Sequence, residues 1–511
     1  MSSRFKVAAV LLFVAFLVLS FAPVLQADTV SVAIGIDPET MDPVQQGTTL
    51  VAMMLSHVTE TLVYMDPDGE IHPHLAEDWS ISDDNREYTF YIREGVEFHD
   101  GSELNAEAVK FSLDRIINPD ISTPLIGFYG PMSEVEVVDE YTVTVKFDEP
   151  FAPALMGFAW PTAAIISPQT YEEVGIQDFA RHPVGTGPFE MTDWRAGERL
   201  IMERNENYWG ETALPERIEW VVVPEPGTRT AMVIAGDVDI AYQPPSPDIP
   251  RLEADPGVEL HSVPSTRIMH IALNNTLEPL DDYRVRQALN YAVDSQAIAE
   301  SILMGAGTPN DAPLPDVFFG YQSIGEYDYD PDRARELLAE AGYEDGLELN
   351  FIHPSGRYIL DVQVSETIQS FLADVGIEVN LETMDWPTYQ GMISRSADEA
   401  DHHMALLGWG PLPDAHHVLY SMFHSSQHPP AAFNLPFYDN EEFDSLIEEA
   451  SETLDEETRI DLYYEAQSIV WEEAPWIFLY TQNMVLGIDQ ELEGVVIYPW
   501  EMFSLTGAQT N

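Results

Sequence analysis

The sequence predicts a mixed α/β protein of two to four domains. Its 511 residues are 45% hydrophobic, enough for sizeable cores at roughly 100–200 residues per domain. In the first half, short stretches alternate apolar and polar residues, as in residues 88–92, which is typical of strands with one buried face. In the second half, helical patterns and apolar strand patterns follow one another, and this order favours an open α/β lobe.

The first half is predicted to contain more strands than helices. Asn105 is a candidate N-cap for one helix, because it directly precedes a stretch of helical periodicity. We expect strands at 29–36, 88–92, 141–147 and 218–223, then two strands at 258–263 and 268–273 around a turn, and helices at 51–63, 105–116 and 227–235.

The second half is predicted to alternate helices with strands. Asp330 is a candidate N-cap and is followed by Pro331, a residue favoured at the first helical position. We expect helices at 282–293, 295–304, 331–341, 359–374, 386–394, 441–453 and 456–472, and strands at 347–352, 377–381 and 403–407.

The charge is strongly negative. The chain has 22 Lys and Arg against 88 Asp and Glu, a formal net charge of −66. Such a protein repels phosphate backbones, and no basic patch is visible, so nucleic acid is not an expected partner. The acids are scattered rather than clustered. At molar salt the Debye length is only about 3 Å, which screens self-repulsion, so we interpret this composition as the surface of a halophilic protein.

The chain has no cysteine. This excludes a disulfide, a thiolate zinc site, an iron–sulfur cluster and a cysteine nucleophile. It also excludes the lipid anchor of a bacterial lipoprotein, which is attached to a cysteine.

The N-terminus has the pattern of an export signal. Arg4 and Lys6 precede a nearly continuous apolar stretch over residues 7–22, and Ala27 offers a cleavage position. We expect residues 1–27 to be a signal peptide and the mature, unlipidated protein to be periplasmic. The alternative is an uncleaved membrane anchor; no later stretch approaches the roughly 18 apolar residues of a second span.

Catalytic signatures are absent from the sequence. There is no glycine-rich phosphate loop, no G-x-S-x-G elbow and no H-E-x-x-H motif, so we expect no catalytic residues and no cofactor. Histidines do cluster, and imidazoles can bind transition metals. We interpret them as strand, loop and helix-face residues and expect no metal site. The histidines concerned are His402, His403, His416, His417, His424 and His428.

Several motifs together resemble the family 5 extracellular solute-binding proteins, the peptide, nickel and glutathione receptors of ABC importers. The motifs run in order along essentially the whole mature chain. They are residues 88–101 with 106–112, Gly185-Thr-Gly-Pro-Phe189, Asn207-Tyr-Trp209, residues 284–294 and residues 329–338.

The resemblance is closest to the glutathione-binding branch. Residues 423–440, the Gly356-Arg-Tyr358 segment with Asp361, and the strand end at Trp409-Gly410 fit that branch. Peptide receptors of the family carry an aspartate shortly after the tryptophan to hold the peptide amine. Here the first aspartate after Trp409 is Asp414, whose spacing resembles that of a second, structural aspartate of the family. This departure argues against an ordinary peptide receptor.

The resemblance implies a two-lobed periplasmic-binding-protein-like fold (type II, cluster C) with an extra small inserted domain. The implied parts are base lobe I (28–71, 183–268 and 487–511), the inserted small domain II (72–182) and α/β lobe III (269–486). Ligand is expected between lobes that close by a hinge.

The candidate ligand-binding residues are Arg357, Tyr358, Trp409, Gly410, Asp414 and Phe433. Arg357 follows a predicted strand, and a guanidinium binds a carboxylate through two parallel hydrogen bonds, so it is a candidate carboxylate clamp. The alternative for Arg357 is a surface or interlobe salt bridge. For Trp409 and Tyr358 it is core packing, and for Phe433 it is anchoring of a loop.

These observations predict a monomeric receptor of an ABC importer that captures glutathione or a short peptide and delivers it to a permease with its ATPase subunits. Alternatives within the family are receptors for nickel, a metal chelate or an oligosaccharide. A further alternative is a periplasmic chaperone or sensor without transport coupling.

Overall fold

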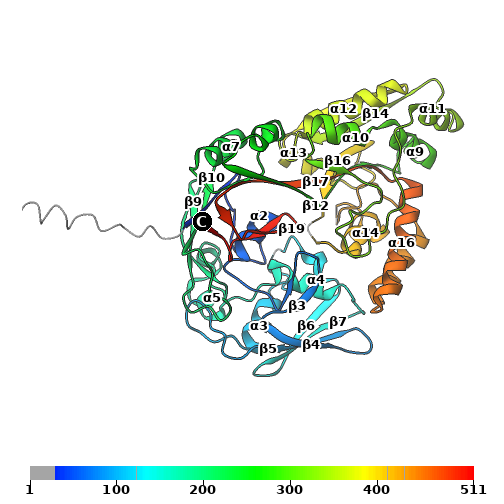
Figure 1. The fold of residues 1–511 in the computed structure, drawn as a ribbon. Helices are drawn as coiled ribbons and strands as arrows, with labels where there is room; N and C mark the ends of the chain where they lie inside the picture. The colour runs from blue at the N-terminus through cyan, green and yellow to red at the C-terminus, as the bar shows by residue number, and fades with distance from the viewer. Residues whose placement is uncertain (1–28, 122, 411, 431, 511) are drawn as a thin grey trace, which may run out of the picture.

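The computed structural model describes residues 29–121, 123–410, 412–430 and 432–510, so the predicted signal peptide lies outside the described residues. The predicted mixed α/β class is confirmed (Figure 1). Most helices and strands lie within one to three residues of their predicted bounds, because their apolar periodicity is strong and local.

An eleven-stranded sheet runs through the molecule. Its two ends differ: β14, β15 and β16 are mutually parallel where they pair, whereas β8, β9 and β10 form an antiparallel meander. The strand order is β15 (Ile377–Met384), β14 (Leu347–Pro354), β16 (Met404–Trp409), β12 (Val258–Leu273), β17 (Trp476–Asp489), β11 (Ile240–Tyr242), β1 (Thr29–Ile34), β10 (Arg217–Val222), β9 (Arg199–Arg204) and β8 (Phe189–Arg195), with β13 (Gly307–Pro309) paired to β17.

Two long antiparallel strands, β12 and β17, cross the middle of this sheet (Figure 1). The prediction of two strands around a turn at 258–273 was wrong, because β12 is one strand of 16 residues. The polar segment from Pro264 to Arg267 resembles a turn in sequence. In the structure it is a bulge, where the pairing with β17 shifts register, and the chain stays extended because neighbouring segments hydrogen-bond to it.

A separate four-stranded antiparallel sheet lies at the bottom of Figure 1. Helix α3 packs against it, and Asn105 caps that helix as predicted, since its side chain accepts a hydrogen bond from the Ala108 N–H. The strand order is β4 (Ala76–Ile81), β5 (Glu87–Ile92), β7 (Thr142–Phe147) and β6 (Met132–Asp139), and the nearby helices are α3 (Ala106–Asp114), α4 (Ala154–Ala159), α5 (Pro168–Val174) and α6 (Ile176–Phe179).

The predicted helix at 51–63 is wrong in its second half. Helix α2 spans Thr49–Leu55, and β2 (Val63–Met65) follows it and pairs with β3 (Ile71–Pro73). The helix ends because the carbonyls of His57 and Val58 accept hydrogen bonds from Phe189 N–H and Gly187 N–H instead of continuing the helical pattern.

Helices surround the β14–β16 end of the large sheet, on the right of Figure 1. The predicted helix at 295–304 is divided: a short turn, α10 (Ser295–Ala297), continues into a wider π-type turn at Ile298–Ile302. The other helices there are α9 (Tyr283–Ala292), α11 (Pro331–Glu340), α12 (Asp361–Asp374), α13 (Trp386–Ile393), α14 (Ala415–Phe423), α15 (Glu441–Glu452) and α16 (Glu456–Glu473). Near the other end lie α7 (Pro226–Ala235) and α8 (Ile249–Glu253), and the C-terminal segment adds β18 (Leu492–Glu493), β19 (Val496–Tyr498), β20 (Met502–Ser504) and β21 (Gln509–Thr510).

The buried carboxylate of Glu60 connects two of the sequence motifs. It accepts hydrogen bonds from Thr186 Oγ1 (2.7 Å), Tyr208 OH (2.6 Å) and Trp209 Nε1 (2.8 Å), and it lies 3.1 Å from His74 Nε2. Burial alone would raise the pKa of Glu60, but these partners outweigh it and lower that pKa. The Gly185–Phe189 and Asn207–Trp209 motifs therefore serve the fold.

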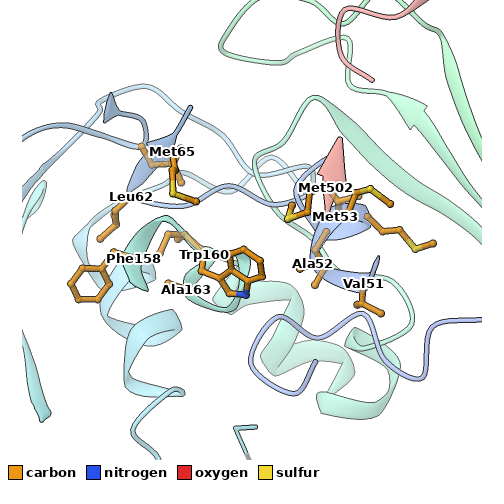
Figure 2. Close-up of a cluster of buried hydrophobic side chains, with 14 of the residues drawn as sticks. Val51, Ala52, Met53, Leu62, Met65, Phe158, Trp160, Ala163 and Met502 are labelled. Atoms are coloured by element: carbon orange, nitrogen blue, oxygen red, sulfur yellow. The ribbon is translucent and has the colours of Figure 1, made fainter. Parts of the chain in front are cut away.

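Methionine-rich packing joins helix α2 to strand β20 near the C-terminal end of the described residues. Figure 2 shows Met53 of α2 beside Met502 of β20, with Trp160 and Met65 on the adjoining side of the same buried cluster. Methionine fills irregular spaces between elements that approach from different directions. Within the described residues, no helix is both long and apolar enough to cross a membrane.

Candidate functional site

The candidate site lies where two parallel strands end. Strands β14 and β16 run in the same direction, so Pro354 and Trp409 come to one edge of the sheet. Open α/β sheets bind ligands at the carboxyl ends of their strands. Gly410 follows Trp409 directly, and Arg357 is the third residue after Pro354.

The loop after β14 is held by one buried carboxylate. Asp361, the first residue of α12, accepts hydrogen bonds from the backbone N–H groups of Gly356 (3.1 Å), Arg357 (2.8 Å) and Tyr358 (3.1 Å). Gly356 has a φ of +77° and Leu360 a φ of +51°, so the loop is tightly bent at both ends. Asp361 therefore fixes the backbone from which the Arg357 side chain extends.

Arg357 is an exposed residue whose guanidinium lies over two aromatic rings. Its central carbon is 5.1 Å from the ring centre of Tyr358 and 5.0 Å from that of Trp386. Among the described residues it has no ion-pair partner. Desolvation by the neighbouring side chains lowers its pKa, and the charge of Arg267 lowers it further, whereas Glu501 raises it. Arginine nevertheless stays protonated in proteins, so this is a cation available to an anion.

Tyr358 is buried beneath that guanidinium. Its ring lies against Gly408 of β16, where an added Cβ would come within 2.7 Å of a ring carbon, so a larger residue at 408 would displace the ring. Its hydroxyl points to the Gly408 carbonyl at 3.5 Å. Trp386 contacts the Tyr358 ring edge-on at 6.2 Å. Tyr358 thus supports Arg357 from below.

Trp409 and Phe433 form a second aromatic group on the opposite face of the sheet. Their ring centres are 4.7 Å apart, Trp409 is half-buried and Phe433 is 42% exposed. Side chains alternate between faces along a strand, so Trp409 and Gly408 point in opposite directions. The structure therefore brings Arg357 and Tyr358 together, and Trp409 and Phe433 together, on two faces of one sheet edge.

Gly410 and Asp414 occupy positions set by the backbone. Gly410 has a φ of +125°, and an added Cβ would lie 2.0 Å from the carbonyl oxygen of Thr266, so this position requires glycine. The Asp414 side chain caps α14 by accepting from His416 N–H at 2.8 Å, and it is 2% exposed. Direct contact of either residue with a ligand stays a prediction.

Sequence reasoning did not find three residues at this site, namely Trp386, Arg267 and Glu501. The sequence predicts Trp386 as the first residue of a helix and gives it no role in binding, and it predicts Arg267 in a turn. Arg267 pairs with Glu501, 234 positions later in the chain, and such distant pairing leaves no local pattern. The excess of acidic residues over arginines was a usable signal, because a buried arginine is almost always paired with an acidic residue.

The histidines of α14 contact the part of the chain that carries the four-stranded sheet. The His416 ring lies 5.5 Å from that of Phe151, and the His417 ring 5.3 Å from that of Phe128. Desolvation by burial lowers the pKa of both histidines. Within the described residues, no three His, Cys, Asp or Glu side chains are grouped so that they could hold a metal ion.

Comparison with known proteins settles the family. The model of the bacterial extracellular solute-binding proteins, family 5, matches residues 70–430. The chain belongs to this family. It is 34% identical over 490 residues to the glutathione-binding protein GsiB of Salmonella typhi, covering 95% of each chain, and 33% identical over 486 residues to that of Escherichia coli O1:K1 / APEC, covering 94% of each.

Solved structures of similar proteins share the fold. HbpA2 from Haemophilus parasuis is 27% identical with a TM-score of 0.85, covering 94% of this chain and all of that one. DppA from Helicobacter pylori, in complex with the peptide STSA, is 26% identical with a TM-score of 0.80, covering 94% and 98%. The periplasmic-binding-protein-like fold is thereby confirmed, and the chain is a solute-binding receptor of the ABC-importer type rather than an enzyme.

Proposed function

We propose that this receptor captures glutathione, or a short peptide related to it, and delivers it to an ABC permease. The observation that carries the proposal is Arg357, an exposed residue on a loop held by Asp361, whose guanidinium has no ion-pair partner among the described residues. In a chain of net charge −66, such a cation at the edge of a sheet is suited to a ligand carboxylate. The similarity to glutathione-binding proteins over 95% of the chain supports the same ligand class.

The Trp409–Phe433 pair gives the proposed site an apolar wall. Aromatic rings contribute large contact areas, and Trp409 keeps part of its surface exposed at the strand end. A ligand lying over this sheet edge would have its carboxylate on Arg357 and its less polar part against the aromatic pair.

We also propose that the mature protein is exported, periplasmic and monomeric, with lobes I (28–71, 183–268, 487–511) and III (269–486) and inserted domain II (72–182).

The bulge of β12 at 264–268 supports a hinge between lobes I and III, because the ladder of hydrogen bonds with β17 is interrupted at this bulge. Domain II contacts α14 through Phe128 against His417 and Phe151 against His416, and opening of the hinge would separate these rings.

A ligand panel with purified mature protein tests the ligand class. Glutathione, glutathione disulfide, Ala-Ala, nickel–histidine and maltotriose would be compared by thermal shift at molar salt. A ligand present at 100 times its Kd should stabilise the protein by about 2.7 kcal/mol. Stabilisation by glutathione and not by maltotriose supports the proposal; stabilisation by maltotriose alone refutes it.

A metal chelate is the second candidate. NikA from Brucella suis, in complex with Fe(III)-EDTA, is 25% identical with a TM-score of 0.84. A carboxylate-rich chelate would also suit an unpaired arginine. In the same panel, a shift with nickel–histidine but none with glutathione would favour this candidate.

A further inference from the structure

Arg267 lies at the bulge of β12, and this bulge is pinned from two sides. Between the pairs Pro264–Asn483 and Ile268–Thr481, β12 contains two more residues than β17. Ser265 Oγ donates to the Gln482 carbonyl at 2.6 Å, and Thr266 N–H donates to the Pro499 carbonyl at 2.9 Å. Bulges redirect side chains, and they are common beside functional sites. The position of Arg267 is thus fixed by the fold.

Glu501 holds one edge of the Arg267 guanidinium. Its carboxylate accepts from Nε at 3.0 Å and from Nη2 at 2.5 Å. Glu501 is 3% exposed and has a φ of +59°. A left-handed backbone at a residue other than glycine is strained, and such residues concentrate at ligand clamps. Burial alone would lower the pKa of Arg267, but Glu501 raises it, so Arg267 stays charged.

The other edge of Arg267 is free. A guanidinium has five N–H donors, and Glu501 engages only Nε and Nη2. Nη1 makes no hydrogen bond within the described part of the chain and is not among its fully buried nitrogens, and 15% of the side chain is exposed. Arg267 can therefore donate to a second acceptor without releasing Glu501.

Arg267 and the Arg357 loop both lie beside the end of β16, where Gly408 leaves space on one face of the sheet. Met269 Sδ and the Tyr358 ring lie 2.6 and 2.7 Å from the point that a Cβ on Gly408 would occupy, so both cover that face. Arg267 directly precedes Ile268, which pairs with Trp409, so the backbone of Arg267 lies beside the end of β16. Its charge also acts on Arg357, whose pKa it lowers. Two arginines lie near two carboxylates here, Glu501 and Asp361, and Asp361 is already engaged by the loop N–H groups.

We propose that Arg267 is a second ligand-binding residue, whose free Nη1 edge contacts the same ligand carboxylate as Arg357. This rests on the proposed function, namely that the site takes a carboxylate-bearing solute. Arg357 approaches the carboxylate from the loop after β14, and Arg267 approaches it from the bulge of β12. The arrangement selects ligands with a free carboxylate and excludes those in which it is blocked as an ester or amide.

The test compares three forms of glutathione by calorimetric titration: unmodified, esterified at the glycine carboxyl, and amidated at the γ-glutamyl α-carboxyl. With the wild type, one blocked form should bind at least about tenfold more weakly than glutathione, and R267M should weaken unmodified glutathione by a similar factor. R267M should not weaken that blocked form further, because the contact is already lost. If R267M weakens all three forms by one common factor, Arg267 acts only through the fold and the proposal is overturned.

R267M alone leaves Glu501 buried without its partner, which destabilises the fold, so the double variant R267M/E501Q is measured alongside it. Ala-Ala and succinate serve as further probes. If Ala-Ala or succinate binds and R267M weakens that binding, while glutathione does not bind, then glutathione is not the ligand but Arg267 is still a carboxylate-binding residue. If glutathione binds equally well to R267M/E501Q and to the wild type, the proposal for Arg267 is overturned and the proposal for glutathione is not. If no carboxylate binds the wild type, both are overturned.

Discussion

Replacing Asp361 by alanine should both loosen the Arg357 loop and destabilise the protein. The carboxylate accepts from three consecutive backbone N–H groups, of Gly356, Arg357 and Tyr358. The first two residues are exposed, so water can replace the carboxylate there, but Tyr358 is buried and its N–H would lose its partner. A hydrogen bond to a charged group contributes about 1.5–3 kcal/mol, and an unsatisfied buried donor costs about 1–3 kcal/mol. We expect a total loss of about 2–4 kcal/mol.

Urea denaturation at molar salt measures the stability, and calorimetry measures glutathione binding. D374A is the matched control, since Asp374 is an exposed aspartate at the other end of the same helix. D361A should lose stability and bind at least about tenfold more weakly, because Arg357 is no longer positioned. D374A should change the stability by less than about 0.5 kcal/mol. If D361A matched D374A in both measurements, the loop would not depend on its carboxylate and the reasoning would be refuted.

Three further predictions concern stability. Lowering the salt from molar to millimolar should markedly lower Tm, because a charge of −66 then repels itself unscreened; an unchanged Tm would contradict the halophilic interpretation. Lowering the pH from 7 to 5 at molar salt should lower the Tm of the wild type more than that of H416Q/H417Q. Both histidines have a pKa below the ordinary 6.5 in the folded protein, so the stability linked to their neutral form is present above pH 6.5 and is lost as the pH falls below it. Equal losses in Tm would refute this. G410A should lower the free energy of unfolding in urea by at least about 1–3 kcal/mol, because Gly410 has a φ of +125° and an added Cβ would meet the Thr266 carbonyl. The control G391A, in a helix with open space around the glycine, should be neutral or stabilising. Equal effects would be evidence against the close approach of Gly410 to the Thr266 carbonyl.

Local patterns in the sequence were sufficient for much of the fold. The strand before Arg357 and the helix after it could be predicted because their apolar periodicity lies within a few residues, and the bounds of β14 and α12 differ from those predicted by only two residues. The motifs that revealed the family proved to be packing motifs; Asn290, for instance, bonds the backbone of Trp476 and Phe478 on β17. The family could therefore be identified from residues whose hydrogen bonds stabilise the fold.

The rest depended on tertiary contacts. The polar run before Ile268 was interpreted as a turn, because its acceptors in β17 and the C-terminal segment are more than 200 residues away. The same distance concealed Glu501 as the partner of Arg267. Trp386 became part of the site only when α13 was placed beside the Arg357 loop. Sequence reasoning thus found Arg357, Tyr358 and Asp361 but not Trp386 or the Arg267–Glu501 pair.

Calorimetric titration of glutathione into wild type, R357A and R333A tests the central claim most directly. Arg333 is an exposed arginine of α11, so R333A removes the same charge away from the site. We predict that R333A binds like the wild type and that R357A binds about 30-fold or more weakly, since an enclosed carboxylate without its partner costs about 2–5 kcal/mol. R357K should recover only part of the affinity, because an ammonium cannot form the planar fork. Binding by R357A within about twofold of the wild type would contradict the assignment of Arg357 as the carboxylate clamp.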